Sequence, residues 1–268
     1  MQMRHDDNRL DKVFQCIVES YIDTAVPVGS RMVSKRYGGH LSPASIRNVM
    51  ADLEEMGLIH QPHTSAGRVP TDRGYRYYVD SLMGTKAARR DMELPNLDRL
   101  LGHSQDLEEA AEKVSRILAS LTRNAGFLLL KEIRRVAYLA ELEESVAQHT
   151  PQPGARQFLY VDGASNILEQ PEFSNLERIQ ALMRAFELKE SLARFLQREI
   201  GSELRIYIGN EVECEDLKNV SIVVKRYSRR GVPVGDLGVI GPTRMNYDET
   251  CAIVERMADS MTEYLEEL

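Results

Sequence analysis

The sequence predicts an α+β protein of two domains, with a helical N-terminal part followed by a mixture of helices and strands. Near the N-terminus, apolar residues recur at the three- and four-residue spacing of helices with one buried face. Farther on, short alternating or continuous apolar runs of strand length lie between longer helical stripes. The 268 residues, 43% of them hydrophobic, are enough for roughly two cores.

Three helices are predicted in the first part of the chain, at residues 10–24, 31–37 and 43–56. The second helix has Ser30 as its candidate N-cap and is stopped by the Gly38-Gly39 pair. The third begins with Ser42 as its cap and Pro43 at the first helical position, where no backbone N–H is needed. Gly57 closes it.

The third helix has two different faces. Its predicted buried stripe consists of Ile46, Val49, Met50 and Leu53. Its outward residues are Ala44, Arg47, Asn48 and Ala51. Short or hydrogen-bonding side chains in the first turns are typical of a helix that enters the major groove of DNA, where Arg pairs with guanine and Asn with adenine. The alternative is that these side chains only form a solvated helix face.

A hairpin is predicted directly after these helices. Residues 58–61 and 68–70 are its candidate strands, joined by the polar turn 63–67, and Thr71 is placed to cap a fourth helix. This order of elements is that of a winged helix-turn-helix. We therefore expect a DNA-binding domain at 1–84, a linker at 85–105, and a second domain at 106–268.

The charge distribution agrees with this interpretation, although the chain is acidic overall. It has 34 Lys and Arg against 41 Asp and Glu, a net charge of −7. Between Arg31 and Arg76 there are seven basic and four acidic residues, a local net charge of +3. A local basic footprint can attract phosphate, while the acidic remainder disfavours unspecific binding to nucleic acid.

Six segments of the sequence carry a resemblance to a known family. They are VGS (28–30), SPASIRN (42–48), TSAGRVPT (64–71), GYRYYVD (74–80), DGASNILEQPEF (162–173) and GDLGVIGPTRM (235–245). In this order they closely resemble the heat-inducible transcription repressor HrcA family. The resemblance implies a bacterial repressor that binds, as a dimer, the inverted-repeat operator CIRCE upstream of chaperone genes. It also implies a GAF-like α/β domain with an inserted dimerising segment, and dependence on the GroEL chaperonin.

The sequence departs from the family between Leu130 and Phe158, where the usual strands and helical segment are largely missing. Residues 131–148 look helical, and Thr150–Gly154 is rich in helix breakers. We therefore expect a GAF-like regulatory and dimerisation domain of reduced size, and the shortened middle leaves open both the usual dimerising insert and any sensory role of the missing strands. Its predicted strands are 158–161, 204–208, 221–224 and 234–240, and its predicted helices begin at 107, 176 and 247. The conspicuous residues of 163–169 and 235–244 are interpreted as turn and strand structure.

The residues expected to contact DNA are Arg31, Lys35, Arg36, Ser42, Ala44, Ser45, Arg47, Asn48, His63, Ser65 and Arg68. Arg68 follows a small, flexible tip, from which a basic side chain can reach phosphate or the minor groove. Tyr75 and Tyr78 share a helical stripe and are expected to pack structurally rather than to stack on bases.

No metal, cofactor or catalytic site is expected. His60 and His63 have no Cys or carboxylate pair beside them, and three unevenly spaced cysteines favour free thiols over a disulfide frame. No spacing typical of an enzyme occurs. A cytoplasmic protein is expected, because no apolar run is long enough to span a membrane and the first residues are polar. Two alternatives stay open: a regulator controlled by a small molecule bound to the second domain, and a non-repressing interaction protein.

Overall fold

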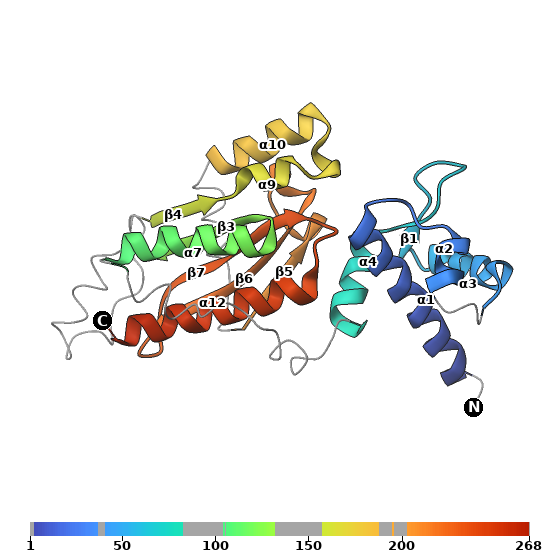
Figure 1. The fold of residues 1–268 in the computed structure, drawn as a ribbon, viewed down its shortest axis with the longest axis horizontal. Coiled ribbons are helices and arrows are strands. Elements are labelled where there is room, and N and C mark those ends of the chain that lie inside the picture. Colours follow the sequence, from blue (N-terminus) through green and yellow to red (C-terminus); the bar gives the residue numbers. More distant parts are fainter. Residues whose placement is uncertain are drawn as a thin grey trace. The chain divides into compact units, whose positions relative to one another are not determined.

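The computed structural model describes residues 3–36, 41–82, 106–131, 157–187 and 203–267, together with 104 and 195. The chain forms two compact units (Figure 1). The first contains Met1–Ala88 and the returning segment Thr243–Asp248, and the second contains Arg89–Pro242 and Glu249–Leu268. Several predicted features lie outside the described residues: the Gly38-Gly39 stop, nearly all of the linker 85–105, the helix 131–148 beyond Lys131, and the breaker-rich segment 150–154.

The N-terminal unit has the predicted order of helices and hairpin. Its elements are α1 (Met3–Thr24), α2 (Ser30–Arg36), α3 (Pro43–Glu55), β1 (Ile59–His60), β2 (Val69–Pro70), α4 (Asp72–Tyr77) and the π-helical turn η1 (Tyr78–Leu82). The short strands β1 and β2 are antiparallel, with Ile59 opposite Pro70 and His60 opposite Val69. The winged helix-turn-helix prediction is confirmed.

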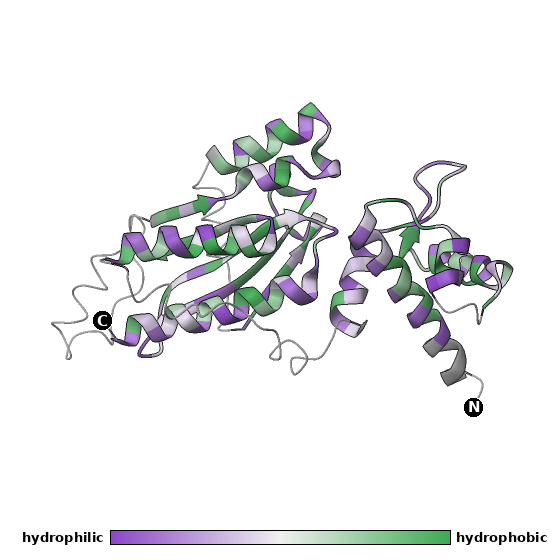
Figure 2. Ribbon diagram, in the orientation of Figure 1, coloured by the Kyte–Doolittle hydropathy of each residue, from purple (hydrophilic) through white to green (hydrophobic). Residues whose placement is uncertain are grey.

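Helix α1 packs against the rest of this unit through one buried face. Val13, Phe14 and Ile17 are fully buried, while polar residues lie on the other side, so the helix alternates in hydropathy along its length (Figure 2). The helix ends at Thr24, as predicted. The next residue, Ala25, has a left-handed backbone with φ 54°, and its N–H donates to the carbonyl of Tyr21.

Helix α2 starts one residue earlier than the sequence predicts. The carbonyl of Gly29 accepts hydrogen bonds from the N–H groups of Met32 and Val33, so Gly29 occupies the N-cap position. The prediction that Ser30 is the cap is therefore wrong: Ser30 is the first residue of the helix. Its hydroxyl is thereby left to face α3.

The second unit is built around an antiparallel sheet of five strands in the order β4-β3-β7-β6-β5. The strands are β3 (Ala125–Lys131), β4 (Gln157–Asp162), β5 (Arg205–Ile208), β6 (Val220–Arg229) and β7 (Val232–Pro242). The helices are α7 (Leu107–Thr122), α9 (Ala164–Leu168), α10 (Leu176–Glu187) and α12 (Tyr247–Glu267). Single 3₁₀ turns are η3 (Pro171–Phe173), η4 (Gly209–Glu211) and η5 (Glu215–Leu217).

Helices cover both faces of this sheet (Figure 1). On one face, Phe127 and Leu129 of β3 share a buried cluster with Ile167 of α9 and Leu182 of α10. Helix α7 packs against β3 and β4, and α12 is tied to the sheet by Lys225, whose Nζ lies 2.6 Å from Asp259 Oδ1. The predicted α+β class is confirmed.

Strand β3, which lies next to the edge strand β4, was not predicted from the sequence. We expected a helix that begins at 107 and further helical structure at 131–148, with no strand between them, whereas Ala125–Lys131 is a strand between β4 and β7. The run Phe127–Leu130 is buried throughout because both faces of the sheet are covered there. A strand buried on both faces has no alternating pattern, so its sequence does not distinguish it from a buried helix.

Candidate DNA-binding interface

Helix α3 presents a polar face whose position follows from its cap and its core contacts. Ser42 has extended backbone, and its Oγ accepts a hydrogen bond from Ser45 N–H at 3.1 Å. Ile46, Val49, Met50 and Leu53 are buried, as predicted. The predicted outward residues Ala44, Arg47, Asn48 and Ala51 are all exposed. Ser42 and Ser45 are exposed beside them, so the first two turns of α3 form a continuous hydrogen-bonding surface.

Arg47 is directed from α3 toward the start of α2. Its Nε lies 3.4 Å from Ser30 Oγ, a long hydrogen bond that an exposed arginine can exchange for a stronger acceptor. Arg31 and Lys35 of α2 are also exposed. The structure thus places cationic side chains of α2 and the exposed face of α3 on neighbouring helices that pack against each other.

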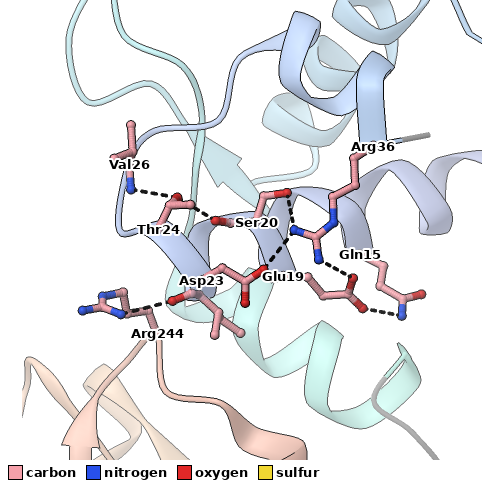
Figure 3. Close-up of polar contacts among 9 residues, drawn as sticks. Gln15, Glu19, Ser20, Asp23, Thr24, Val26, Arg36 and Arg244 are labelled. Carbon is pink, nitrogen blue, oxygen red and sulfur yellow. Dashed lines mark hydrogen bonds and ion pairs between the residues drawn. The ribbon is translucent and has the colours of Figure 1, made fainter. Parts of the chain in front are cut away.

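Arg36 has a different environment from the other cations of α2 (Figure 3). Its Nη1 donates to Asp23 Oδ2 at 3.0 Å and to Ser20 Oγ at 3.1 Å, and its Nη2 lies 3.6 Å from Glu19 Oε2. The hydrogen bond to Asp23 raises the pKa of the guanidinium above its ordinary value. All three partners belong to α1, so Arg36 holds α2 against α1.

The wing contains a third strand-like segment that the sequence analysis did not identify. Val28 and Arg68 exchange two backbone hydrogen bonds of 2.9 Å, which add Val28 to the edge of the β1-β2 hairpin. Gly67 permits this approach, since a Cβ atom there would lie 2.5 Å from the carbonyl carbon of Val28. At the tip, Gln61 Nε2 donates to the carbonyls of Thr64 and Ala66.

The three wing residues expected to contact DNA lie in two different places. His63 and Ser65 are exposed at the tip. Arg68 lies at the base of the wing, where its Nε and Nη2 are 3.0 Å and 2.9 Å from Glu54 Oε2. Glu54 is in the last turn of α3. The guanidinium of Arg68 therefore joins the wing to α3.

Helix α4 and the turn after it are anchored by buried tyrosines. Thr71 caps α4, as predicted, by accepting from Gly74 N–H. Tyr75 and Tyr78 are 2% and 4% exposed, which confirms that they pack structurally and excludes stacking on bases. Burial and the charge of Asp248 raise the pKa of Tyr78 above its ordinary value.

The returning segment Thr243–Asp248 packs in the N-terminal unit, which the sequence did not indicate. The ring of Tyr247 lies 6.0 Å from that of Tyr75, and Tyr78 Oη lies 3.4 Å from Asp248 Oδ2. Arg244 Nη1 donates to the carbonyl of Ile22 at 3.1 Å, near the end of α1 (Figure 3). These contacts join residues more than 160 positions apart, which no local pattern predicts.

The described part of the chain offers little for other kinds of site. Within it, no three His, Cys, Asp or Glu side chains are placed to hold a metal ion, and no helix is long and apolar enough to cross a membrane. Cys16, Cys214 and Cys251 are free thiols. In the second unit, a cavity of about 520 Å³ lies between α7 and β4, lined by Glu112, Ser115, Arg116 and Phe158–Asp162.

Comparison with known proteins identifies the same family for both ends of the chain. Residues 133–251 match the family model described as "HrcA protein C terminal domain". Heat-inducible transcription repressor HrcA of Syntrophobacter fumaroxidans is 31% identical over 335 aligned positions, which cover 95% of this chain and 96% of that protein. The HrcA of Pelotomaculum thermopropionicum is 33% identical over 340 positions, covering 98% and 97%.

The fold as a whole also has a solved counterpart. A crystal structure of a hypothetical protein superposes with a TM-score of 0.72 and 22% sequence identity, and the match covers 97% of this chain and 98% of that one.

The alignments also show that this chain is shorter than its relatives. They extend over 335 and 340 positions, more than the 268 residues available here, so the relatives contain residues that this chain lacks. The winged helix, the match of residues 133–251 to the family's C-terminal domain and near full-length identity above 30% agree. The chain belongs to the HrcA family of heat-inducible transcription repressors.

Proposed function

We propose that this protein represses chaperone genes in the bacterial cytoplasm by binding, as a dimer, a CIRCE-type inverted-repeat operator and thereby occluding the promoter. The observation that carries the proposal is the exposed face of α3. It is capped, rigidly packed on its other side, and bordered by the exposed cations Arg31 and Lys35 of α2. This is the arrangement by which a helix is presented to the major groove.

The exposed residues divide by the part of DNA that suits them. Arg47 is assigned to guanine and Asn48 to adenine, because their side chains can form paired hydrogen bonds with these bases. Arg31 and Lys35 are assigned to phosphates, together with the hydroxyls of Ser42 and Ser45 at the N-terminus of α3. The small side chain of Ala44 lets α3 approach the bases closely, and the wing-tip residues His63 and Ser65 reach the adjacent backbone.

Fluorescence anisotropy with an inverted-repeat duplex and a scrambled duplex tests the assignment of α3. The Arg47→Ala variant is expected to lose about 1–3 kcal/mol of operator binding and to relax base preference. The control is Arg205→Ala, which removes the same charge from an exposed site on β5 in the second unit. Unchanged preference for the operator in Arg47→Ala would show that α3 is not the reading helix.

Chaperonin dependence is the finer part of the proposal, and it rests on the family resemblance. If a chaperonin returns the protein to its DNA-binding form, unfolded clients that occupy the chaperonin during heat stress lift repression. Adding a GroEL-type chaperonin to the operator-binding assay should then raise the active fraction of the protein. No change in that fraction would remove this step and leave DNA binding untouched.

A second candidate is a repressor whose DNA affinity is set by a small molecule. The cavity between α7 and β4 is the place that favours it, since its lining combines Glu112, Arg116 and Asp162 with the rings of Phe158 and Tyr160. A metabolite that raises the melting temperature saturably and changes operator affinity would support this candidate. In neither case do we assign an enzymatic activity, since the named relatives are repressors.

A further inference from the structure

The base of the wing is held at three points that converge on one residue. The backbone N–H groups of Arg68 and Val28 each donate a hydrogen bond to the carbonyl of the other residue. The guanidinium of Arg68 lies with Nη2 at 2.9 Å and Nε at 3.0 Å from Glu54 Oε2. Val28 lies just before α2, and Glu54 lies in the last turn of α3. Arg68 therefore connects the wing to both helices of the helix-turn-helix.

The ion pair is shielded more than the surrounding cations are. The side chains of Arg68 and Glu54 are 23% and 36% exposed, whereas Arg31, Lys35 and Arg47 are exposed. Two guanidinium nitrogens bond the same carboxylate oxygen. A charge-assisted contact of this kind fixes orientation as well as distance.

We infer that Arg68 and Glu54 act together as a clamp that sets the position of the wing relative to α3, so that Arg68 is a positioning residue rather than a phosphate contact. This inference rests on the proposed function, in which α3 and the wing tip bind the same duplex. With the clamp intact, His63 and Ser65 at the tip and Arg47 on α3 are presented at a constant separation. Without the clamp, the wing loses conformational freedom each time the protein binds DNA, and this entropic cost lowers the affinity.

The opposite assignment of Arg68 predicts the opposite sign in a simple experiment. If Arg68 bound phosphate, removing Glu54 would free its guanidinium and delete a negative charge near DNA, so binding would tighten. If the clamp positions the wing, Glu54→Ala weakens binding. The matched control is Glu55→Ala, which removes the same charge from the next, exposed position of α3.

Operator affinity of the full-length protein is therefore compared in these two variants. We expect Glu54→Ala to bind the inverted-repeat duplex about threefold to fivefold more weakly than Glu55→Ala, the effect of one partly exposed ion pair. Tighter binding by Glu54→Ala would overturn the inference. Circular dichroism of both variants checks that the helices are retained.

The salt dependence of binding separates positioning from direct contact for Arg68 itself. Arg68→Ala should weaken binding while keeping the slope of log affinity against log salt, because no phosphate contact is lost. The double variant Glu54→Ala/Arg68→Ala should bind within about twofold of Arg68→Ala, since the clamp is already broken. A slope reduced by about one unit, or a further additive loss in the double variant, would contradict the clamp.

Amide hydrogen exchange without DNA keeps this test independent of the proposed function. Exchange in residues 59–70 should be faster in Glu54→Ala than in Glu55→Ala, because the Arg68 N–H bonded to Val28 opens more often. Equal exchange in the two variants would refute the clamp even if the protein binds its operator. Failure of the wild-type protein to prefer the operator, with the exchange difference present, would refute only the proposed function.

Discussion

Individual arginines of the N-terminal unit look alike in the sequence but differ in their partners. Arg47 reaches only a long contact with Ser30, whereas Arg36 bonds Asp23 and Arg68 bonds Glu54. The sequence shows only that basic residues outnumber acidic ones between Arg31 and Arg76. It could not assign partners, because an ion pair between residues 13 or 14 positions apart depends on how the helices pack.

Lys35 provides the residue-scale test of phosphate contact. Replacing it with alanine should weaken binding to operator and scrambled duplexes alike, because a phosphate contact does not read sequence. The slope of log affinity against log salt should fall by about 0.9. Titrations at several salt concentrations measure this slope. The charge-matched control is Lys218→Ala, at the residue that directly follows η5 in the second unit. A sequence-selective loss in Lys35→Ala would contradict the assignment.

The raised pKa of Tyr78 leads us to expect that the N-terminal unit becomes less stable at alkaline pH. Burial, followed by the charge of Asp248, raises the pKa of its phenol above the ordinary 10.0. The unfolded chain therefore ionises first as pH rises, so the contribution to stability is complete below about pH 10 and is lost above it. Urea unfolding at about pH 8 and about pH 10.5 should show a smaller loss in Tyr78→Phe than in wild type. Equal losses would contradict this role of Tyr78.

At the scale of elements, sequence patterns predicted the helices with one buried face and the buried runs of β6 and β7, but missed β3, which is also buried on both faces. Helix α3 was predicted to the residue on its buried stripe because its other face meets solvent. Strand β3 gave only a continuous apolar run, and the returning segment Thr243–Asp248 gave no signal at all. Periodicity reports contrast between two environments, so it disappears where both sides of an element are buried.

The turn that leads from β4 into α9 has a glycine for two separate reasons. Gly163 has a left-handed backbone with φ 74°, and a Cβ atom there would lie 2.5 Å from Ala119 Cβ. Gly231, between β6 and β7, has nearly the same φ of 73° but nothing within 4 Å of such an atom. In both alanine variants, the strained backbone lowers the free energy of unfolding by about 1 kcal/mol. Only Gly163→Ala adds a packing clash, which lowers it by about 1–3 kcal/mol more.

Denaturant unfolding of the second unit compares the two variants. Gly163→Ala should be clearly less stable than Gly231→Ala, because the matched backbone cost cancels in the difference. The same loss of stability in both variants would mean that the turn relaxes away from Ala119 without cost.

At the scale of the whole molecule, the question is how a chain shorter than its relatives brings two winged helices to one operator. The relatives align over more positions than this chain has residues, and the shortened middle leaves the usual dimerising insert open. An inverted repeat nonetheless requires two winged helices, one for each half-site. In the proposed function, repression by this shorter protein therefore depends on two chains binding one operator.

Light scattering of the protein with an inverted-repeat duplex, coupled to size exclusion, tests this account most directly. We expect two chains per duplex, and much weaker binding when one half-site is scrambled, because each α3 then reads one half-site. A complex of one chain per duplex that forms equally well with the intact and the scrambled repeat would contradict the account.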